Sequence, residues 1–172
     1  MGIKRKFPAK TATVHCSGGC RAKRGEDGAL LCTYGCIGCG ACVTACRFDA
    51  IHINDIGCAE TDEMKCIGRG ACARRCPRGI ISLRRTEDRI AVLCANRDKG
   101  FDPATRTGAR MVCDVSCIAC GLCVKSCPAD AIHVTDFHAV IDYERCLSCG
   151  ACAAACPRRA IHDRFGILTP QR

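Results

Sequence analysis

Three copies of one cysteine pattern constrain the fold of this chain more than any other feature of its sequence. The spacing C-x2-C-x2-C-x3-C occurs in full three times, beginning at Cys36, Cys117 and Cys146. A loop that carries a thiol every third residue can wrap one face of a cube-shaped group, so that three sulfurs meet three irons. Zinc ribbons normally use separated C-x2-C pairs, which this dense spacing does not resemble. The pattern therefore predicts [4Fe–4S] clusters.

A fourth copy of the pattern is incomplete. Cys66, Cys72 and Cys76 keep their places, but Arg69 stands where the second cysteine belongs. Arginine is not a plausible ligand, because its side chain stays protonated. Three outcomes are open at this position: a [3Fe–4S] cluster, a four-iron cluster with a substitute ligand, or an empty site. Cys58 is the nearest spare thiol for the substitute role.

The motifs also predict which cysteines share a cluster. In two-cluster bacterial ferredoxins the last cysteine of each motif ligates the other cluster of the pair. This rule predicts four sites. Site 1 is formed by Cys36, Cys39, Cys42 and Cys76. Site 2 is the incomplete one, formed by Cys46, Cys66 and Cys72. Site 3 is formed by Cys117, Cys120, Cys123 and Cys156. Site 4 is formed by Cys146, Cys149, Cys152 and Cys127.

An internal duplication sets the fold class. CTYGCIGCGACVTACRFDAIHI from Cys32 matches CDVSCIACGLCVKSCPADAIHV from Cys113, and KCIGRGACARRCPRGII from Lys65 matches RCLSCGACAAACPRRAI from Arg145. Ala-rich stretches near the third cysteines predict short helices, the AIHI and AIHV runs predict strands, and NDIG predicts a hairpin turn. We predict an α+β fold of two tandem bacterial 2[4Fe–4S] ferredoxin-like modules with short helices and β-hairpins. The first module, residues 1–88, includes the N-terminal cysteine-containing segment, and the second, residues 89–172, includes the connector.

Five more cysteines lie outside the motifs: Cys16, Cys20, Cys32, Cys94 and Cys113. Cys16 and Cys94 are equivalent under the duplication, as are Cys32 and Cys113. If the modules pack about a pseudo-twofold axis, those four thiols converge on a fifth cluster, with Cys20 competing for a place. The alternative is that these residues are buried small hydrophobic side chains or free thiols.

Composition and charge exclude the main rival classes. The chain has 21 cysteines but only five Phe, two Tyr and no Trp, so apolar burial alone cannot stabilise it. Disulfides would require an oxidising compartment, whereas the start MGIKRKFPAK shows no signal peptide. Each four-thiolate cluster carries about −2, so four or five clusters offset most of the formal charge of +9. We therefore expect a cytoplasmic protein that binds no nucleic acid.

Several segments resemble the RnfB family, the ferredoxin-like components of Rnf-type electron transport complexes. They include VHCSGGC, YGCIGCGACVTACRFDAI, CPRGIISL, VLCANRDKG and CPADAIHV, and the resemblance runs from about Ala12 to Ile161. The resemblance implies a tandem 2[4Fe–4S] ferredoxin fold that passes low-potential electrons between ferredoxin and a flavin- or NAD-linked partner. The family normally carries an N-terminal membrane helix, which is missing here. We therefore expect no membrane span, although peripheral association is compatible with the sequence.

The leading functional hypothesis is an electron-carrier subunit of an oxidoreductase complex, with no active site of its own. Four to five [4Fe–4S] clusters are expected as cofactors, and other redox subunits as partners. The alternatives are a free-standing soluble polyferredoxin and an iron–sulfur sensor. For the basic start of the chain and the RRTEDR stretch from Arg84 two interpretations are open: docking on acidic surfaces, or solvated, mobile segments.

Overall fold

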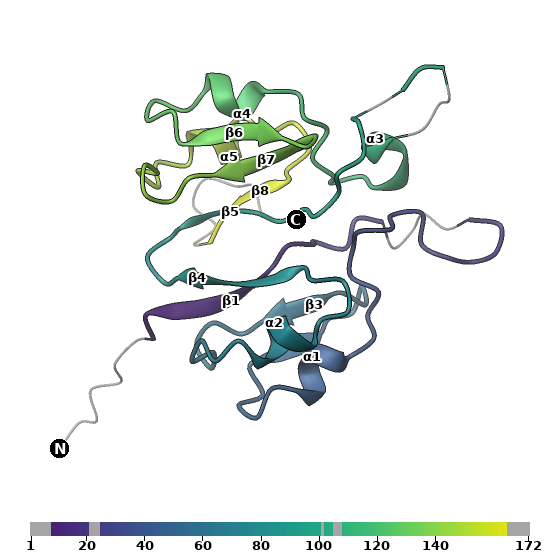
Figure 1. Ribbon diagram of the computed structural model, residues 1–172, viewed down its shortest axis with the longest axis vertical. Coiled ribbons are helices and arrows are strands. Elements are labelled where there is room, and N and C mark those ends of the chain that lie inside the picture. The colour runs from purple at the N-terminus through teal and green to yellow at the C-terminus, as the bar shows by residue number, and fades with distance from the viewer. Residues whose placement is uncertain (1–7, 21–24, 101, 105–107, 165–172) are drawn as a thin grey trace.

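The computed structural model describes residues 8–20, 25–100, 102–104 and 108–164. In the part of the chain that it describes, two similar modules lie one above the other (Figure 1). The first module contains β1 (Lys10–Val14), α1 (Ala41–Thr44), β2 (Ile51–Ile53), β3 (Ala59–Thr61), α2 (Ala71–Arg75) and β4 (Ile81–Arg85). The second contains β5 (Ile90–Val92), α3 (Ala109–Val112), α4 (Leu122–Lys125), β6 (Ile132–Thr135), β7 (His138–Ile141), α5 (Ala151–Ala154) and β8 (Ile161–Asp163). The α+β prediction is confirmed.

Each module is built from the same two antiparallel strand pairs. A hairpin, β2–β3 in the first module and β6–β7 in the second, follows the first cysteine motif. The other pair joins the ends of the module, β1 with β4 and β5 with β8. The predicted boundary between residues 88 and 89 falls between β4 and β5.

Local sequence accounts for the turns. In the NDIG turn the Asn54 side chain accepts the backbone N–H of Cys58 at 2.9 Å, and Gly57 adopts a φ of 74°. The second hairpin turns at Asp136 and Phe137, which both have positive φ, as two-residue hairpin loops require. The predicted hairpins and strands therefore lie where the sequence patterns indicate.

The sequence patterns do not predict strands β1 and β5, which lie outside the cysteine motifs and the runs that follow them. Their sequences, KTATV and IAV, are short, and their partners lie about 70 residues away in the chain. Burial explains why they form. Val14 and Ile81 are 7% and 6% exposed, and Ile90 and Ile161 are 1% and 2% exposed.

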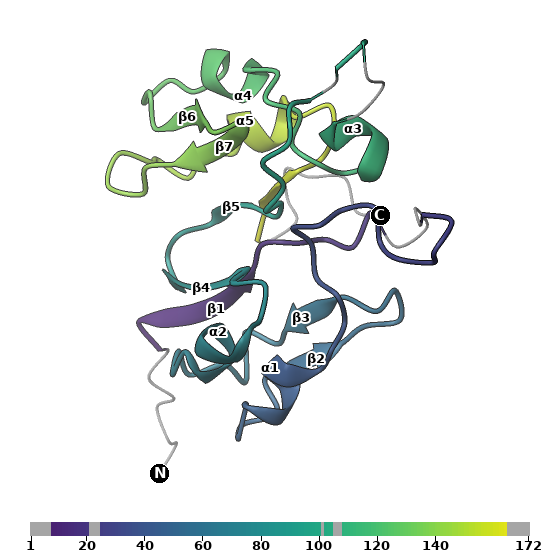
Figure 2. The same cartoon turned by 45° about the vertical axis from the view of Figure 1, so that its right-hand side comes forward.

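Polar contacts between the modules involve both terminal strand pairs, which lie side by side in Figures 1 and 2. The Arg164 guanidinium contacts the Glu63 carboxylate and the Thr11 hydroxyl, and it donates to the Thr86 carbonyl at 2.9 Å. The ring of His15 lies 2.9 Å from the Val92 carbonyl oxygen. These bonds hold the two modules together.

The RRTEDR stretch does not form the predicted docking surface. Arg84 is 6% exposed and donates to the Ile90 carbonyl at 2.7 Å. Arg85 pairs with Asp88 at 3.1 Å, and Arg89 makes two bonds of 2.7 Å to the Asp163 carboxylate. These arginines are held by internal bonds. Most of the basic start, residues 1–7, lies outside the described residues.

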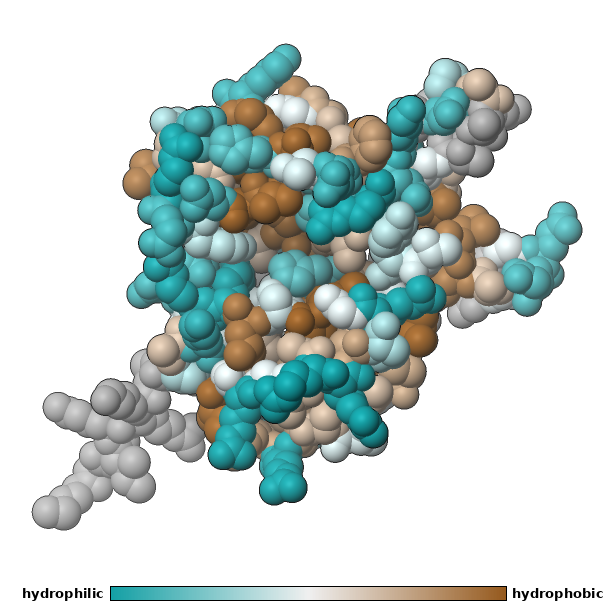
Figure 3. All heavy atoms as spheres, in the orientation of Figure 1, coloured by the Kyte–Doolittle hydropathy of each residue, from teal (hydrophilic) through white to brown (hydrophobic). Residues whose placement is uncertain are grey.

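No helix in the described ranges has the length and apolar character that crossing a membrane would need. Polar and apolar side chains are mixed on the face shown in Figure 3, with apolar patches on both modules.

Candidate iron–sulfur centres

Site 1 brings together cysteines from both motifs of the first module. Cys36, Cys39 and Cys42 line one cavity with Cys76, although Cys76 follows Cys72 in the second motif. The Cys36 sulfur accepts the backbone N–H of Ala59 at 3.4 Å. Ile53, Ile80 and Ile81 complete the wall and exclude water. This is the crossed arrangement that the motif rule predicts.

Sites 3 and 4 repeat the crossed arrangement in the second module. Site 3 is a cavity lined by Cys117, Cys120, Cys123 and Cys156. Site 4 is lined by Cys127, Cys146, Cys149 and Cys152. Backbone N–H groups donate to sulfur at both, from Ala160 to Cys156 at 3.3 Å and from Ala131 to Cys127 at 3.3 Å. Four sulfurs in an apolar pocket with N–H donors fit a [4Fe–4S] cluster.

The thiols of these sites are costly to ionise without iron. Burial raises the pKa of Cys123 and of Cys152 to about 11. Iron binds the thiolate, so cluster binding must displace these protons and offset the free-energy cost of forming a thiolate in a buried site. Folding and cluster binding should therefore be coupled.

Left-handed glycines place the third cysteine of each motif. Gly40, Gly70, Gly121 and Gly150 precede α1, α2, α4 and α5, with φ between 72° and 78°. A side chain at such a φ is strained, so glycine lets the loop turn sharply into the helix. The third cysteine, the second residue of each helix, is buried at all four sites.

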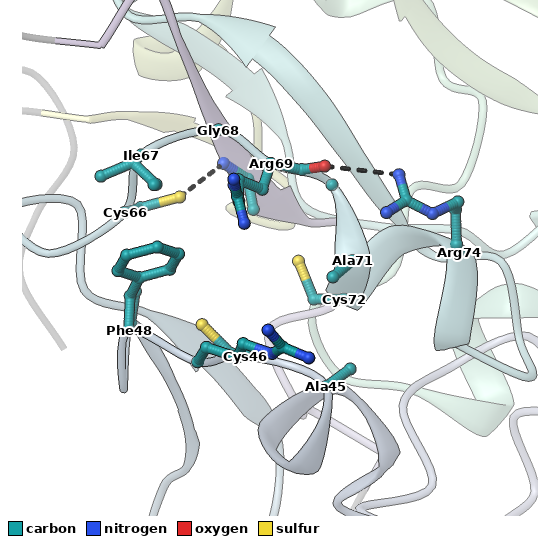
Figure 4. Close-up of a pocket in the computed structure, with 14 residues that line it drawn as sticks. Ala45, Cys46, Phe48, Cys66, Ile67, Gly68, Arg69, Ala71, Cys72 and Arg74 are labelled. Atoms are coloured by element: carbon teal, nitrogen blue, oxygen red, sulfur yellow. Dashed lines mark hydrogen bonds between the residues drawn. The ribbon is translucent and has the colours of Figure 1, made fainter.

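Site 2 has three thiols around a wider opening. Cys46, Cys66 and Cys72 line a cavity of about 230 Å³, and their sulfurs point toward its middle in Figure 4. The Cys66 sulfur accepts the backbone N–H of Ala12 at 3.3 Å. Arg69 lies over the Phe48 ring, with its guanidinium carbon 5.7 Å from the ring centre.

The thiol that site 2 lacks is the exposed one. Cys39, Cys120 and Cys149, the second cysteines of the complete motifs, are exposed, whereas the other ligands are buried or half-buried. Arg69 occupies this exposed corner. Arg47 and Arg74 also line the cavity, so the surroundings of site 2 are positively charged.

Cys58 does not serve site 2. It is absent from the lining of that cavity, and its thiol donates to the Cys16 carbonyl at 3.4 Å. The second module shows the same contact. His138 corresponds to Cys58, Cys94 corresponds to Cys16, and the His138 Nε2 lies 2.6 Å from the Cys94 carbonyl oxygen. The nearest thiol in sequence is therefore a structural residue beside site 1.

The remaining cysteines divide into two groups. Cys20, Cys32 and Cys113 form a small buried cluster of their own, with Tyr34, Val112 and Val115 against it. Cys94 lies apart from them, and its sulfur accepts the backbone N–H of Cys117 at 3.3 Å. Burial raises the pKa of Cys94 to about 12. Of the four thiols expected to converge, Cys32 and Cys113 lie together with Cys20, and Cys94 lies apart from them.

Across the described ranges, no three His, Cys, Asp or Glu side chains meet closely enough to chelate a single metal ion. The cysteines of sites 1 to 4 line cavities instead.

Family models match both modules. Residues 35–80 and residues 116–161 each match a 4Fe-4S dicluster domain, and together they cover just over half of the chain.

Two relatives that belong to complexes, and one small ferredoxin, resemble parts of this chain. The B component of the ion-translocating oxidoreductase complex of Methanosarcina acetivorans is 42% identical over 66% of this chain and 41% of its own length. The B component of the Na(+)-translocating ferredoxin:NAD(+) oxidoreductase complex of Acetobacterium woodii is 38% identical over 79% of this chain and 44% of its own length. Ferredoxin-3 of Rhodobacter capsulatus is 35% identical over 40% of this chain and 71% of its own length.

The chain spans less than half the length of the two relatives that belong to complexes. It covers more than two thirds of the small ferredoxin. The crossed cysteine sites, the two matched domains and these identities all indicate the same family. The chain therefore belongs to the 4Fe–4S dicluster ferredoxins, is a homologue of the RnfB components of Rnf-type electron transport complexes, and carries several [4Fe–4S] clusters.

Proposed function

We propose that this chain is an electron-transfer subunit that relays low-potential electrons between ferredoxin and a flavin- or NAD-linked partner in an oxidoreductase complex. Its ligands are the cysteines of sites 1, 3 and 4, with site 2 as an altered fourth centre. It works in the cytoplasm, with peripheral association where the complex is membrane-bound. It has no active site of its own.

The crossed ligands are the observation that carries this proposal. Cys46 belongs to the loop of site 1 but lines site 2, and Cys76 does the reverse. Cys127 and Cys156 cross in the same way between sites 3 and 4. Because each centre takes one cysteine from the loop of the other, the two centres of a module are neighbours in space. Neighbouring centres suit the transfer of electrons from one to the next.

When bound, the clusters supply one-electron chemistry, and the protein tunes it. Backbone N–H groups donate to sulfur at all four sites, including Ser148 to Cys146 at 3.4 Å. Such bonds offset negative charge on the cluster and raise its potential, while burial among isoleucines lowers it. The exposed cysteines, Cys39, Cys120 and Cys149, give partners a short route to the clusters.

The names of the two relatives that belong to complexes support the choice of partners. One complex is called a ferredoxin:NAD(+) oxidoreductase and the other an ion-translocating oxidoreductase. Ferredoxin and a nicotinamide- or flavin-bearing subunit are thus the partners we propose for this chain.

Redox titration of anaerobically purified protein tests the proposal. We expect iron and sulfide in about equal amounts, reversible low-potential signals by electron paramagnetic resonance, and reduction by reduced ferredoxin. The protein alone should not turn over NADH, and electrons should reach an acceptor only when a flavin-containing partner is added. Stoichiometric zinc with little sulfide would overturn the proposal, as would NADH turnover by the chain alone.

A further inference from the structure

Four cysteines outside the ferredoxin motifs meet where the two modules join. We call Cys16, Cys20, Cys32 and Cys113 the interface set. The first three come from the segment that precedes the first motif, and Cys113 comes from the end of α3 in the second module. Neither matched family domain includes any of them.

Contacts among the thiols show that the set is a single group. Cys20, Cys32 and Cys113 pack together as one buried cluster. A Cβ atom added at Gly19, the residue before Cys20, would lie 3.2 Å from the Cys113 sulfur. A Cβ atom added at Gly35 would lie 3.4 Å from the Cys20 sulfur and 3.5 Å from those of Cys16 and Cys32. The three sulfurs therefore gather around one point beside the Gly35 backbone.

The set has the surroundings of a cluster site. Cys20, Cys32 and Cys113 are 1%, 5% and 8% exposed, as buried as the inner ligands of sites 1 to 4. Asn96, only 1% exposed, donates from its amide nitrogen to the Cys32 sulfur at 3.6 Å. A fully buried amide directed at a sulfur repeats the N–H donation seen at the other four sites.

The interface set lies between site 1 and site 3. The Cys16 sulfur accepts the backbone N–H of Cys36, a site 1 cysteine, at 3.4 Å. Cys113 lies shortly before Cys117, the first cysteine of site 3, in the sequence CDVSC. The two segments also touch directly, since the Asp114 N–H donates to the Gly19 carbonyl at 3.4 Å. In Figure 1 the segment after β1 and the segment around α3 run together on one side of the molecule.

We propose that the interface set binds a fifth [4Fe–4S] cluster, which joins the cluster pair of one module to that of the other. On binding, each of the four thiols exchanges with one terminal thiolate of a preassembled cluster: the incoming sulfur forms one S–Fe bond, the outgoing thiolate gives up its own S–Fe bond and takes the proton, and no oxidation state changes. With this cluster in place, electrons have one continuous path through both modules. The path runs from site 2 to site 1, then through the interface set to site 3 and site 4. This inference rests on the proposed function and extends it.

The alternative is that the set is a group of free thiols that packs the interface. Cys58 provides the matched control, because it is 2% exposed, lies beside Cys16, and is not part of the set. A structural role would make Cys20, Cys113 and Cys58 alike in their effect on iron content. A cluster ligand would set the first two apart.

Iron and sulfide counts on the whole, anaerobically purified protein provide the test. With site 2 empty, three-iron or four-iron, sites 1 to 4 hold about 12, 15 or 16 irons, and a fifth cluster raises these counts to about 16, 19 or 20. Cys20→Ala and Cys113→Ala should each lose about four irons and four sulfides, and Cys58→Ala should lose none. In the fully reduced wild type, spin coupling should extend across the modules, and it should be confined to each module in Cys113→Ala.

Unaltered iron in Cys20→Ala and Cys113→Ala would overturn the proposal. So would a wild-type count of about 12 or 15 irons, which leaves none for a fifth cluster and does not depend on how the variants fold; at a count of about 16 the two variants decide. In either case reversible low-potential signals from sites 1, 3 and 4 would leave the proposed relay function intact. Absence of sulfide would defeat that function instead.

Discussion

At the exposed corner of site 2 the chain carries Arg69, whereas the other three sites carry a cysteine at that place. An iron at this corner would face solvent with no thiolate to hold it. The guanidinium cannot replace the thiolate, because it stays protonated. Loss of one iron, leaving [3Fe–4S], is the outcome we expect from three thiols.

Arg69→Cys should complete site 2. Protein-bound iron should rise by about one if the site holds three irons and by about four if it is empty. The paramagnetic signal of an oxidised three-iron cluster should disappear in the first case, because an oxidised four-iron cluster is diamagnetic. Arg75→Cys, which adds a thiol to α2 away from the cavity, is the control. Unchanged iron in Arg69→Cys would contradict the altered site.

Cys76→Ala tests the crossed ligands. Cys76 lines site 1 with Cys36, so its loss should remove or convert the site 1 cluster and leave the distinct signal of site 2 unchanged. Iron should fall by between about one and four per chain. Cys58→Ala again serves as the control, because this thiol lines neither cavity. Loss of the site 2 signal with site 1 intact would show that the motif binds without crossing.

The identity and spacing of the residues predict most of the cluster ligands, but they predict less about the residues around the clusters. The spacing of Cys36, Cys39 and Cys42 predicts a cluster loop because those thiols are neighbours in sequence. Spacing could not show that Cys20 approaches Cys113, because that contact depends on how the modules pack. It also could not place Cys58, whose position follows from the hairpin that it shares with His138.

At the scale of elements, the hairpins and cluster helices could be read from sequence, and the terminal strand pairs could not. The AIHI and AIHV runs became β2 and β6, each of which buries its first isoleucine, Ile51 or Ile132, in the core. Strands β1 and β5 have weak local signals and pair with distant partners, so only the folded module defines them. The arginines of RRTEDR were misread for the same reason, since the Ile90 carbonyl that binds Arg84 belongs to β5.

Gly68→Ala should disturb the contact between the site 2 loop and β1. Gly68 has a φ of 73°, and an added Cβ would lie 2.3 Å from the Lys10 carbonyl oxygen. Gly40 has the same φ but has nothing within 4 Å of an added Cβ, so Gly40→Ala measures the backbone strain alone, about 1–2 kcal/mol. Thermal loss of cluster absorbance under anaerobic conditions should therefore begin at a lower temperature in Gly68→Ala. Equal midpoints in the two variants would contradict the predicted clash.

At the scale of the whole molecule, the two modules form a chain of centres with an exposed cysteine at three of them. A diffusible shuttle accepts and donates at one exposed site and needs one or two clusters. Four or five clusters are useful when electrons must cross a distance between fixed partners. Clusters of about −2 each also offset the formal charge of +9, so a basic surface is not what selects those partners.

The chain should therefore be found as a stable part of a larger complex. Leu147 is 69% exposed and lies two residues from the exposed Cys149 of site 4, so an apolar contact there would bring a redox subunit to the cluster edge. Gel filtration and native mass spectrometry of protein from its own host should show a complex that contains a flavin-bearing subunit. Leu147→Asp should weaken that complex at least tenfold, or about 1.4 kcal/mol. Because Leu147 also lines the site 4 cavity, the iron count measured on the same variant separates weaker docking from damage to the cluster. Val140→Asp, at a residue 44% exposed on β7, should leave the complex intact. A free monomer that is fully active as a diffusible ferredoxin would show that the chain is an independent carrier, because no second subunit would then be needed to complete the path.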